Sequence, residues 1–410
     1  MKILKNITTT TMVMALLLVS SLEARETKKV SNFSGSNFVE SSGTFDGNRI
    51  YADVTNNGLF LDYHISGDSA LEWPKGTGVH SIFQSALWMG ATVNGQIRTI
   101  VGDYTQDMGP GPYGGDPLAA VHRIYKVNKS MLDDPASHDD FQNWPTDWGA
   151  PWVDADGDGV YTPLPAGPDH PEFIGDQVIW FVSNDGDIAY KLNFGTDPMG
   201  VEIQTTMFGY DRIDAIGDML FVKQLVINKG GDDLVDTYMG LWSDPDLGYA
   251  GDDFVGCNVD LGMGYVWNDG ADSQYDNLDI GTPAAGYDFF QGPKVPCDDP
   301  TDPVECPAQG AKMFGTYFPG EKNLKMSSFA FYINGDATYT DPSDETEGYY
   351  YLQGLRKDGS AYPTEIAGDL YDQKFCFYGD PEVAHSSANP VDGNYAASAD
   401  RRFLMSVGPF

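Results

Sequence analysis

Basic residues are scarce in this 410-residue sequence, in which 24 Lys and Arg stand against 60 Asp and Glu. The resulting net charge of −36 repels nucleic acid and anionic membrane surfaces, and it attracts divalent cations. We therefore expect no nucleic-acid partner. The alternative explanation of this charge is solubility in a salty medium, where screening makes a strongly acidic surface tolerable.

Cysteine is also scarce, and all four residues lie in the last two-fifths of the chain: Cys257, Cys297, Cys306 and Cys376. No CxxC or Cys/His cluster is present, which argues against zinc. In an exported protein an even cysteine count favours disulfides, with three possible pairings. Cys297 and Cys306 flank a short polar loop that contains proline, so we expect them to be bridged. Cys257 with Cys376 is then the remaining pair.

Long apolar runs are missing after the N-terminal segment, so we expect no membrane insertion. The first residues follow the order of a secretory signal peptide: Lys2 and Lys5, the apolar run Met12–Val19, and Ala24 before the cleavage site. The alternative is a membrane anchor, but this run is well short of the ~20 residues that a spanning helix needs. We predict a signal peptide over 1–24 and a mature protein that is secreted or held at the cell surface.

Motifs of common enzyme classes are missing as well: there is no HExxH, no GxSxG and no phosphate-binding glycine loop. The six histidines are scattered, and His64 lies in an apolar run that favours a structural role. A carboxylate pair for glycoside hydrolysis is not recognisable among 60 acidic residues. The sequence therefore leaves any catalytic residues unknown and favours a protein that is not an enzyme.

Short apolar and aromatic runs recur at strand length through the chain. In Val201–Met207 apolar and polar residues alternate, which is typical of a half-buried strand. Turn dipeptides such as Asn94-Gly95, together with 47 Gly and 25 Pro, leave little room for long helices. We predict an all-β, antiparallel, β-sandwich-like fold in one large or two contiguous domains. The expected strands are Arg49–Val54, Leu59–Ile65, Ile82–Met89, Arg123–Val127, Val178–Val182, Val201–Tyr210, Met219–Ile227, Thr237–Trp242, Gly264–Trp267, Ser328–Ile333 and Lys374–Tyr378.

The composition divides the mature chain into four parts. We expect a Ser/Asn-rich leader over 25–47, an N-terminal β region over 48–150, a calcium-loop segment over 151–176 and a C-terminal β region over 177–410. A domain boundary is expected within Met131–Pro171, where aspartates and loop residues dominate. The alternative is a long functional loop inside a single domain.

The segment from Asp154 to Tyr161 has a specific chemical meaning. Asp154, Asp156 and Asp158 alternate along it and offer carboxylate oxygens, Gly159 permits a sharp turn, and Val160 can offer its carbonyl oxygen. Calcium accepts six to eight such oxygen ligands, whereas magnesium prefers fewer protein ligands. We therefore predict a Ca²⁺ site.

This loop departs from an EF-hand, because its twelfth position is Pro165 in place of a bidentate Glu. Another carboxylate must complete the shell, and Asp169, Glu172 and Asp176 are the nearest in sequence. We favour Asp169 or Asp176. The alternative is a merely acidic turn.

A second acidic cluster, Asp244-Pro-Asp246 followed by Asp252-Asp253, has no ordered ligand spacing and is a weaker candidate. The tryptophans allow a sugar-binding platform, although packing is the commoner role of such residues. They are Trp73, Trp88, Trp144, Trp148, Trp152, Trp180, Trp242 and Trp267.

Several segments resemble a group of uncharacterised large secreted bacterial proteins from Bacteroidota-like and related marine lineages, which usually end in a type IX secretion sorting domain. The resemblance runs from about residue 45 to the end. Its segments are Leu71–Gly76, Ala86–Gly90 with Asn94-Gly95, Asp154–Tyr161, Gly175–Trp180, Gly240–Gly248 with Asp252–Cys257, and Arg401–Phe410.

The resemblance implies that further β-structure and a sorting domain follow Phe403–Phe410, so we expect a truncated chain. It supplies no reaction. We expect a secreted or cell-surface, calcium-stabilised, non-catalytic β-protein that acts in adhesion, matrix or glycan contact. A secreted polysaccharide hydrolase is the alternative.

Overall fold

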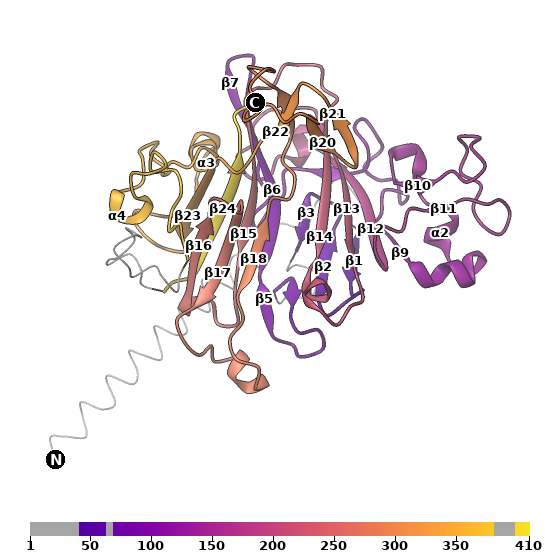
Figure 1. The fold of residues 1–410 in the computed structure, drawn as a ribbon, viewed down its shortest axis with the longest axis horizontal. Coiled ribbons are helices and arrows are strands. Elements are labelled where there is room, and N and C mark those ends of the chain that lie inside the picture. Colours follow the sequence, from indigo (N-terminus) through magenta and orange to yellow (C-terminus); the bar gives the residue numbers. More distant parts are fainter. Residues whose placement is uncertain (1–40, 63–68, 381–397) are drawn as a thin grey trace.

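A computed structural model describes residues 41–62, 69–380 and 398–410 (Figure 1). The predicted signal peptide, most of the predicted leader and His64 lie outside these ranges. Within them, no helix has the length and apolar character needed to cross a membrane.

The prediction of an all-β fold is confirmed. Every pairing between the described strands is antiparallel. The α-helices of the described ranges are short: α2 spans Asp139–Gln142, α3 spans Glu345–Leu352 and α4 spans Thr364–Ala367. Short 3-10 helices lie in the loops at Lys129–Asp133, Pro135–Ser137, Thr146–Trp148, Ile188–Tyr190, Ala215–Asp218, Ala250–Asp252 and Tyr275–Leu278.

The sheets are arranged in a propeller-like manner, and the two-layer sandwich that we expected is wrong (Figure 1). The reason is that the apolar residues do not form one slab between two sheets. They divide into four separate clusters, which lie on both faces of the sheets and between neighbouring sheets. Sheets that are covered in this way stand side by side across the molecule.

The largest sheet has six strands, and one of its interior strands is formed by the last described segment of the chain. The strand order is β23 (Ser328–Ile333), β24 (Arg401–Val407), β15 (Val235–Asp244), β6 (Gln84–Val93) and β3 (Leu59–Leu61), with β7 (Gln96–Ile100) also paired to β6. All seven residues of β24 are buried. β24 pairs with β15 over Phe403–Val407 and with β23 over Arg401–Ser406.

The second large sheet joins β14 (Phe221–Asn228), β13 (Val201–Gly209), β12 (Gln177–Asn184) and β8 (Gly109–Pro110), with β9 (Tyr125–Asn128) also paired to β12. The predicted strand at Val201–Met207 is thus present. It is almost entirely buried and not half-buried as expected, because apolar clusters cover both of its faces.

A four-stranded sheet contains β1 (Ser42–Phe45), β2 (Tyr51–Thr55), β4 (Leu71–Glu72) and β5 (His80–Ile82), and a three-stranded sheet contains β16 (Asp253–Asn258), β17 (Met263–Asn268) and β18 (Ala285–Asp288). Part of the predicted leader therefore forms β1, in which the buried Phe45 pairs with Ala52. The two-stranded sheets are β10 (Trp152–Val153) with β11 (His170–Pro171), β19 (Lys294–Pro296) with β22 (Glu321–Asn323), and β20 (Ala311–Met313) with β21 (Thr316–Phe318).

The strand that we expected at Lys374–Tyr378 is wrong. Phe377 has a φ of 52°, in the left-handed region, and this conformation interrupts an extended run. The segment instead makes single bridges, through Phe375 to Phe329 and through Tyr378 to Cys257.

Tryptophans fill the core more than the surface. Trp88 and Trp242 stack at a centroid distance of 5.9 Å on the six-stranded sheet. Trp180 and Trp144 are buried in the cluster beside β12. These four residues therefore serve packing, the commoner of the two roles considered.

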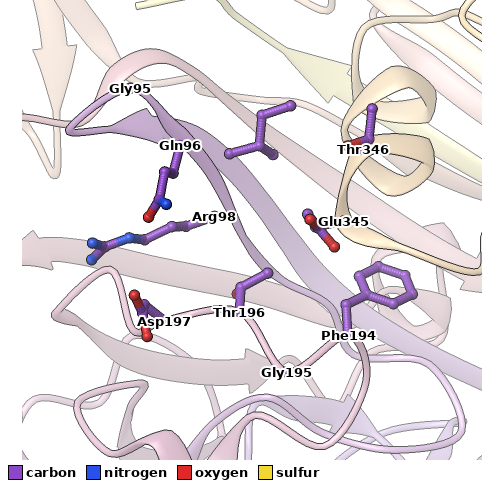
Figure 2. A pocket seen from close by; sticks show the side chains of 10 residues that line it. Gly95, Gln96, Arg98, Phe194, Gly195, Thr196, Asp197, Glu345 and Thr346 are labelled. Atoms are coloured by element: carbon purple, nitrogen blue, oxygen red, sulfur yellow. The ribbon is translucent and has the colours of Figure 1, made fainter.

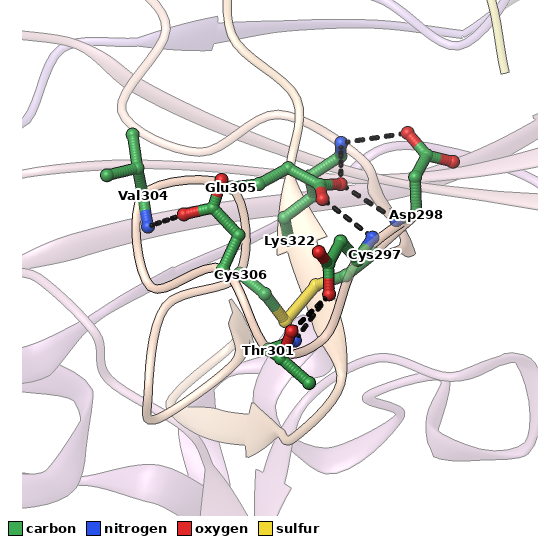
Figure 3. The surroundings of a disulfide bond; sticks show 9 residues. Cys297, Asp298, Thr301, Val304, Glu305, Cys306 and Lys322 are labelled. Carbon is green, nitrogen blue, oxygen red and sulfur yellow. Dashed lines mark hydrogen bonds and ion pairs between the residues drawn. A yellow bond between two sulfur atoms is a disulfide. The ribbon is translucent and has the colours of Figure 1, made fainter.

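The predicted bridge between Cys297 and Cys306 is present (Figure 3). Glu305, next to the bridge, accepts hydrogen bonds from the backbone N–H groups of Asp298 and Asp299, both at 2.7 Å. Its carboxylate also pairs with Lys322 Nζ at 2.6 Å, and these contacts lower the pKa of Glu305 to about 2.

The second expected disulfide is absent, since Cys257 and Cys376 are both free thiols. They lie close together, but the Cys257 thiol donates to the carbonyl oxygen of Cys376 at 3.5 Å and does not meet its sulfur. Complete burial raises the pKa of both thiols well above the usual value.

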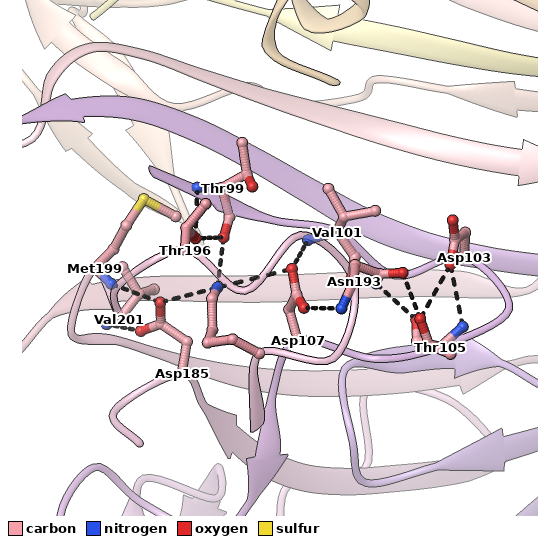
Figure 4. Close-up of polar contacts among 11 residues, drawn as sticks. Thr99, Val101, Asp103, Thr105, Asp107, Asp185, Asn193, Thr196, Met199 and Val201 are labelled. Atoms are coloured by element: carbon pink, nitrogen blue, oxygen red, sulfur yellow. Dashed lines mark hydrogen bonds and ion pairs between the residues drawn. The ribbon is translucent and has the colours of Figure 1, made fainter. Parts of the chain in front are cut away.

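A buried charge network joins β7 to the loop between β12 and β13 (Figure 4). Lys191 is fully buried, and its Nζ lies 3.6 Å from Asp185 Oδ2 and 3.8 Å from Asp107 Oδ2. It also donates to the carbonyl oxygen of Thr99 in β7. This contact links the loop that contains Asn193 and Thr196 to the six-stranded sheet.

Candidate metal site

The predicted calcium loop belongs to a long excursion from one sheet. β9 and β12 are direct neighbours, so the chain between Asn128 and Gln177 leaves this sheet and returns to it. Within the excursion, β10 pairs with β11 so that Val153 faces His170. The next residues outward are Asp154 and Asp169, and the short hairpin therefore brings them to the same end.

Two glycines let the loop wrap around the Asp154 carboxylate. Gly157 and Gly159 both have a φ of 77°, which strongly favours glycine. The Asp154 carboxylate accepts hydrogen bonds from the N–H groups of Gly157 at 2.7 Å, Gly159 at 3.0 Å and Asp158 at 3.2 Å. These bonds fix the position of one acidic side chain at the centre of the turn.

Asp169, the residue before β11, closes the loop from its other end. It is fully buried, and its two carboxylate oxygens accept from the N–H groups of Ala155 at 2.9 Å and Thr162 at 2.7 Å. Carboxylate oxygens of Asp154, Asp156 and Asp169 all lie within 4.8 Å of one another. We call these three residues the acidic triad.

The acidic triad contains three of the predicted ligands and omits the others. The Asp158 carboxylate is used locally, where it accepts from the N–H of Val160 at 2.7 Å. Asp176 lies outside the triad, beside the start of β12, and accepts from the N–H of Asp211 at 2.8 Å. Of the two candidates for the completing carboxylate, the structure brings Asp169 to the loop and places Asp176 elsewhere.

The electrostatics of the triad are those of crowded like charges. The pKa of the Asp156 carboxyl is raised, because desolvation and the negative charges of neighbouring aspartates both disfavour ionisation. The pKa of the nearby Tyr161 hydroxyl is also raised, by burial and by the charge of Asp169. A bound cation relieves such repulsion, so this arrangement has the chemistry of a metal site.

The second acidic cluster takes a different form. Carboxylate oxygens of Asp244, Asp246 and Asp400 lie within 4.8 Å of one another, but Arg402 contacts both Asp244 and Asp400 at 3.2 Å. Tyr104 also donates to Asp244 at 2.6 Å. A guanidinium already balances part of this charge, which makes the cluster a structural ion network.

Asp400 and Arg402 were not predicted to join this cluster, because only the pairing of β24 with β15 brings them to Asp244. The nearby Asp253 is buried. Desolvation, with the charges of Asp246 and Asp252, raises its pKa to about 9.

Comparison with protein-family models, with curated proteins and with solved structures found no match. The fold and the acidic triad therefore define the chain by themselves. It is an all-β protein of antiparallel sheets with an acidic group that can hold a metal ion.

Proposed function

We propose that this chain is a secreted or cell-surface, calcium-stabilised β-protein that is non-catalytic and contacts extracellular glycan or matrix. The observation that carries the proposal is the convergence of Asp154, Asp156 and Asp169 at one end of the β10–β11 hairpin. Export is supported by the order of basic, apolar and small residues at the N-terminus.

Calcium is favoured over other cations by the donor set. All three side chains of the triad are carboxylates, which are hard oxygen ligands, and no cysteine or histidine belongs to the group within the described residues. Asp154 and Asp156 are exposed, so water can supply further ligands. Calcium accepts such a mixed, irregular shell, whereas magnesium needs a near-ideal octahedron.

Thermal unfolding in CaCl2 and in EDTA tests the metal part. A cation bound only by the native state stabilises it by about 2.7 kcal/mol at a hundredfold excess over Kd. Asp156→Asn should remove most of this gain, since it deletes one carboxylate of the triad. The fold of the loop should change little, because the contact of Asp156 with the Asp158 N–H is long, at 3.3 Å. Asp147→Asn, an exposed aspartate of the same excursion, is the matched control and should keep the gain.

An unchanged melting temperature of the native sequence in EDTA and in CaCl2 contradicts calcium stabilisation. An equal gain with MgCl2 contradicts the preference for calcium. The contact with glycan or matrix is tested separately, by the binding assay described below.

A further inference from the structure

A polar pocket lies between three segments that are distant in sequence (Figure 2). Its volume is about 470 Å³, within the range of small-molecule sites. The walls are the start of β7 with the preceding turn (residues 95–98), the loop at residues 194–197, and the first turn of α3 at Glu345 and Thr346.

The β7 wall is set by the predicted hairpin turn. Asn94 and Gly95 have φ values of 51° and 80°, as a tight two-residue hairpin requires, and Val93 pairs with Gln96. Residues two apart on a strand share a face, so Gln96 and Arg98 project on the same side. Arg98 Nη1 donates to the carbonyl oxygen of Pro198 at 2.6 Å, which ties this wall to the loop opposite.

A helix cap and side-chain packing fix the other two walls of the pocket. Asp344 caps α3 by accepting from the N–H of Glu347 at 2.9 Å, and this fixes Glu345 in the first turn. The ring of Phe194 packs closely against Gly348 of the same helix. A Cβ added at Gly348 would lie only 3.0 Å from this ring. In Figure 2, the side chain of Glu345 extends from the helix into the space above Phe194.

The chemistry of the lining disfavours anionic ligands. A phosphate or a carboxylate would meet the negative charges of Asp197 and Glu345, which outnumber the single cation Arg98. A cationic ligand would be attracted by the two carboxylates, but it would leave the donor groups of Arg98 and Gln96 unused. A neutral ligand with many hydroxyl groups uses both kinds of group, since each hydroxyl donates to a carboxylate and accepts from an amide or guanidinium.

We propose that this pocket binds a neutral saccharide unit, with Glu345 and Gln96 as hydrogen-bonding residues and Phe194 as the apolar surface for the sugar ring. Aromatic rings pack against the C–H faces of sugars while neighbouring polar groups fix their orientation. The proposal rests on the glycan contact proposed above and assigns it to one place on the molecule.

The test is affinity electrophoresis of the full chain in native gels that contain soluble laminarin, galactomannan or xyloglucan. We expect at least one of these neutral polysaccharides to retard the native sequence. Glu345→Gln should weaken the retardation about tenfold in apparent Kd, as expected when a hydrogen bond to a charged group is lost. The matched control is Glu365→Gln, which makes the same charge change in the first turn of α4, at an exposed residue. Gln96→Ala, at the exposed first residue of β7, gives a second variant that leaves the helix intact.

The outcomes distinguish the proposed saccharide pocket from the more general proposal of glycan contact. Retardation that is equal in the native sequence, Glu345→Gln and Gln96→Ala overturns the pocket but keeps glycan contact. If none of the three polysaccharides retards the native sequence, both the pocket and the glycan contact are overturned. The calcium test is independent of this result. Retardation by acidic polygalacturonate alone overturns the neutral ligand class. If reducing ends also appear and Glu345→Gln abolishes them, the pocket is supported and the hydrolase alternative replaces a non-catalytic role.

Discussion

Replacing Lys191 with methionine should destabilise the protein far more than a surface substitution. Methionine keeps much of the aliphatic stem but removes the charge between Asp185 and Asp107 (Figure 4). Both carboxylates are buried, and removing one partner of a buried ion group typically costs about 3–5 kcal/mol because the remaining charge is uncompensated.

The structure places the expected loss at the lower end, about 3 kcal/mol. Each carboxylate keeps two backbone donors after the change. Asp185 accepts from the N–H groups of Met199 at 2.7 Å and Val201 at 2.6 Å, and Asp107 accepts from those of Val101 and Asn193, both at 3.0 Å. These bonds compensate part of the lost attraction.

The assay is urea unfolding followed by tryptophan fluorescence. A loss of about 3 kcal/mol lowers the midpoint by roughly 1 M where the slope is about 3 kcal/mol/M. The control is Lys229→Met, since Lys229 is 43% exposed and lies 3.9 Å from Glu202, a geometry worth less than about 1 kcal/mol. The deficit of Lys191→Met should shrink at acidic pH, because burial raises the pKa of the Asp107 carboxyl and the loss of the Lys191 charge raises it further. Equal midpoints for the two variants at pH 7 would refute the argument.

Three further results are expected. Cys297→Ser with Cys306→Ser should lower the free energy of unfolding by roughly 2–3 kcal/mol, the chain-entropy value for so short a loop; an unchanged urea midpoint contradicts this. Cys257 and Cys376 should resist iodoacetamide in the native protein and react once it is unfolded, so mass spectrometry that finds early labelling opposes their burial. Asp253 has a folded pKa of about 9 against an unfolded value near 3.9, so its contribution weakens the fold progressively as pH rises between these values. Asp253→Asn should therefore reduce the fall in melting temperature from pH 5 to pH 8, and an identical fall in both proteins refutes the assignment.

Local features were predictable from the sequence because local chemistry determines them. The Asn94-Gly95 turn forms because its left-handed backbone suits few other residues, and the bridge from Cys297 to Cys306 closes a loop of only a few residues. The alternating residues of Val201–Met207 identify a strand in any all-β fold. Asp154 and Asp156 belong to one turn, so their spacing was informative.

Features that depend on distant segments were not predictable. Arg402 reaches Asp244 only because β24 lies between β23 and β15, strands that come earlier in the chain. The pocket that we propose for a saccharide combines β7 and its hairpin turn with one loop and α3, and nothing in the sequence of these segments indicates that they meet. The choice between a sandwich and a propeller-like arrangement depends on how sheets pack, which strand periodicity does not encode.

Hydrogen bonds within the loops give a second explanation for the high aspartate content. Several aspartates accept a hydrogen bond from the N–H two residues ahead, a local turn that substitutes for secondary structure. These pairs are Asp116 with Leu118, Asp158 with Val160, Asp187 with Ala189, Asp299 with Thr301, Asp302 with Val304, Asp336 with Thr338 and Asp358 with Ser360. A fold of short strands needs many such turns, so part of the negative charge follows from backbone bonding. Charge alone therefore does not locate a cation. What distinguishes Asp154, Asp156 and Asp169 is that three carboxylates from the two ends and the interior of the loop between β10 and β11 converge on one point.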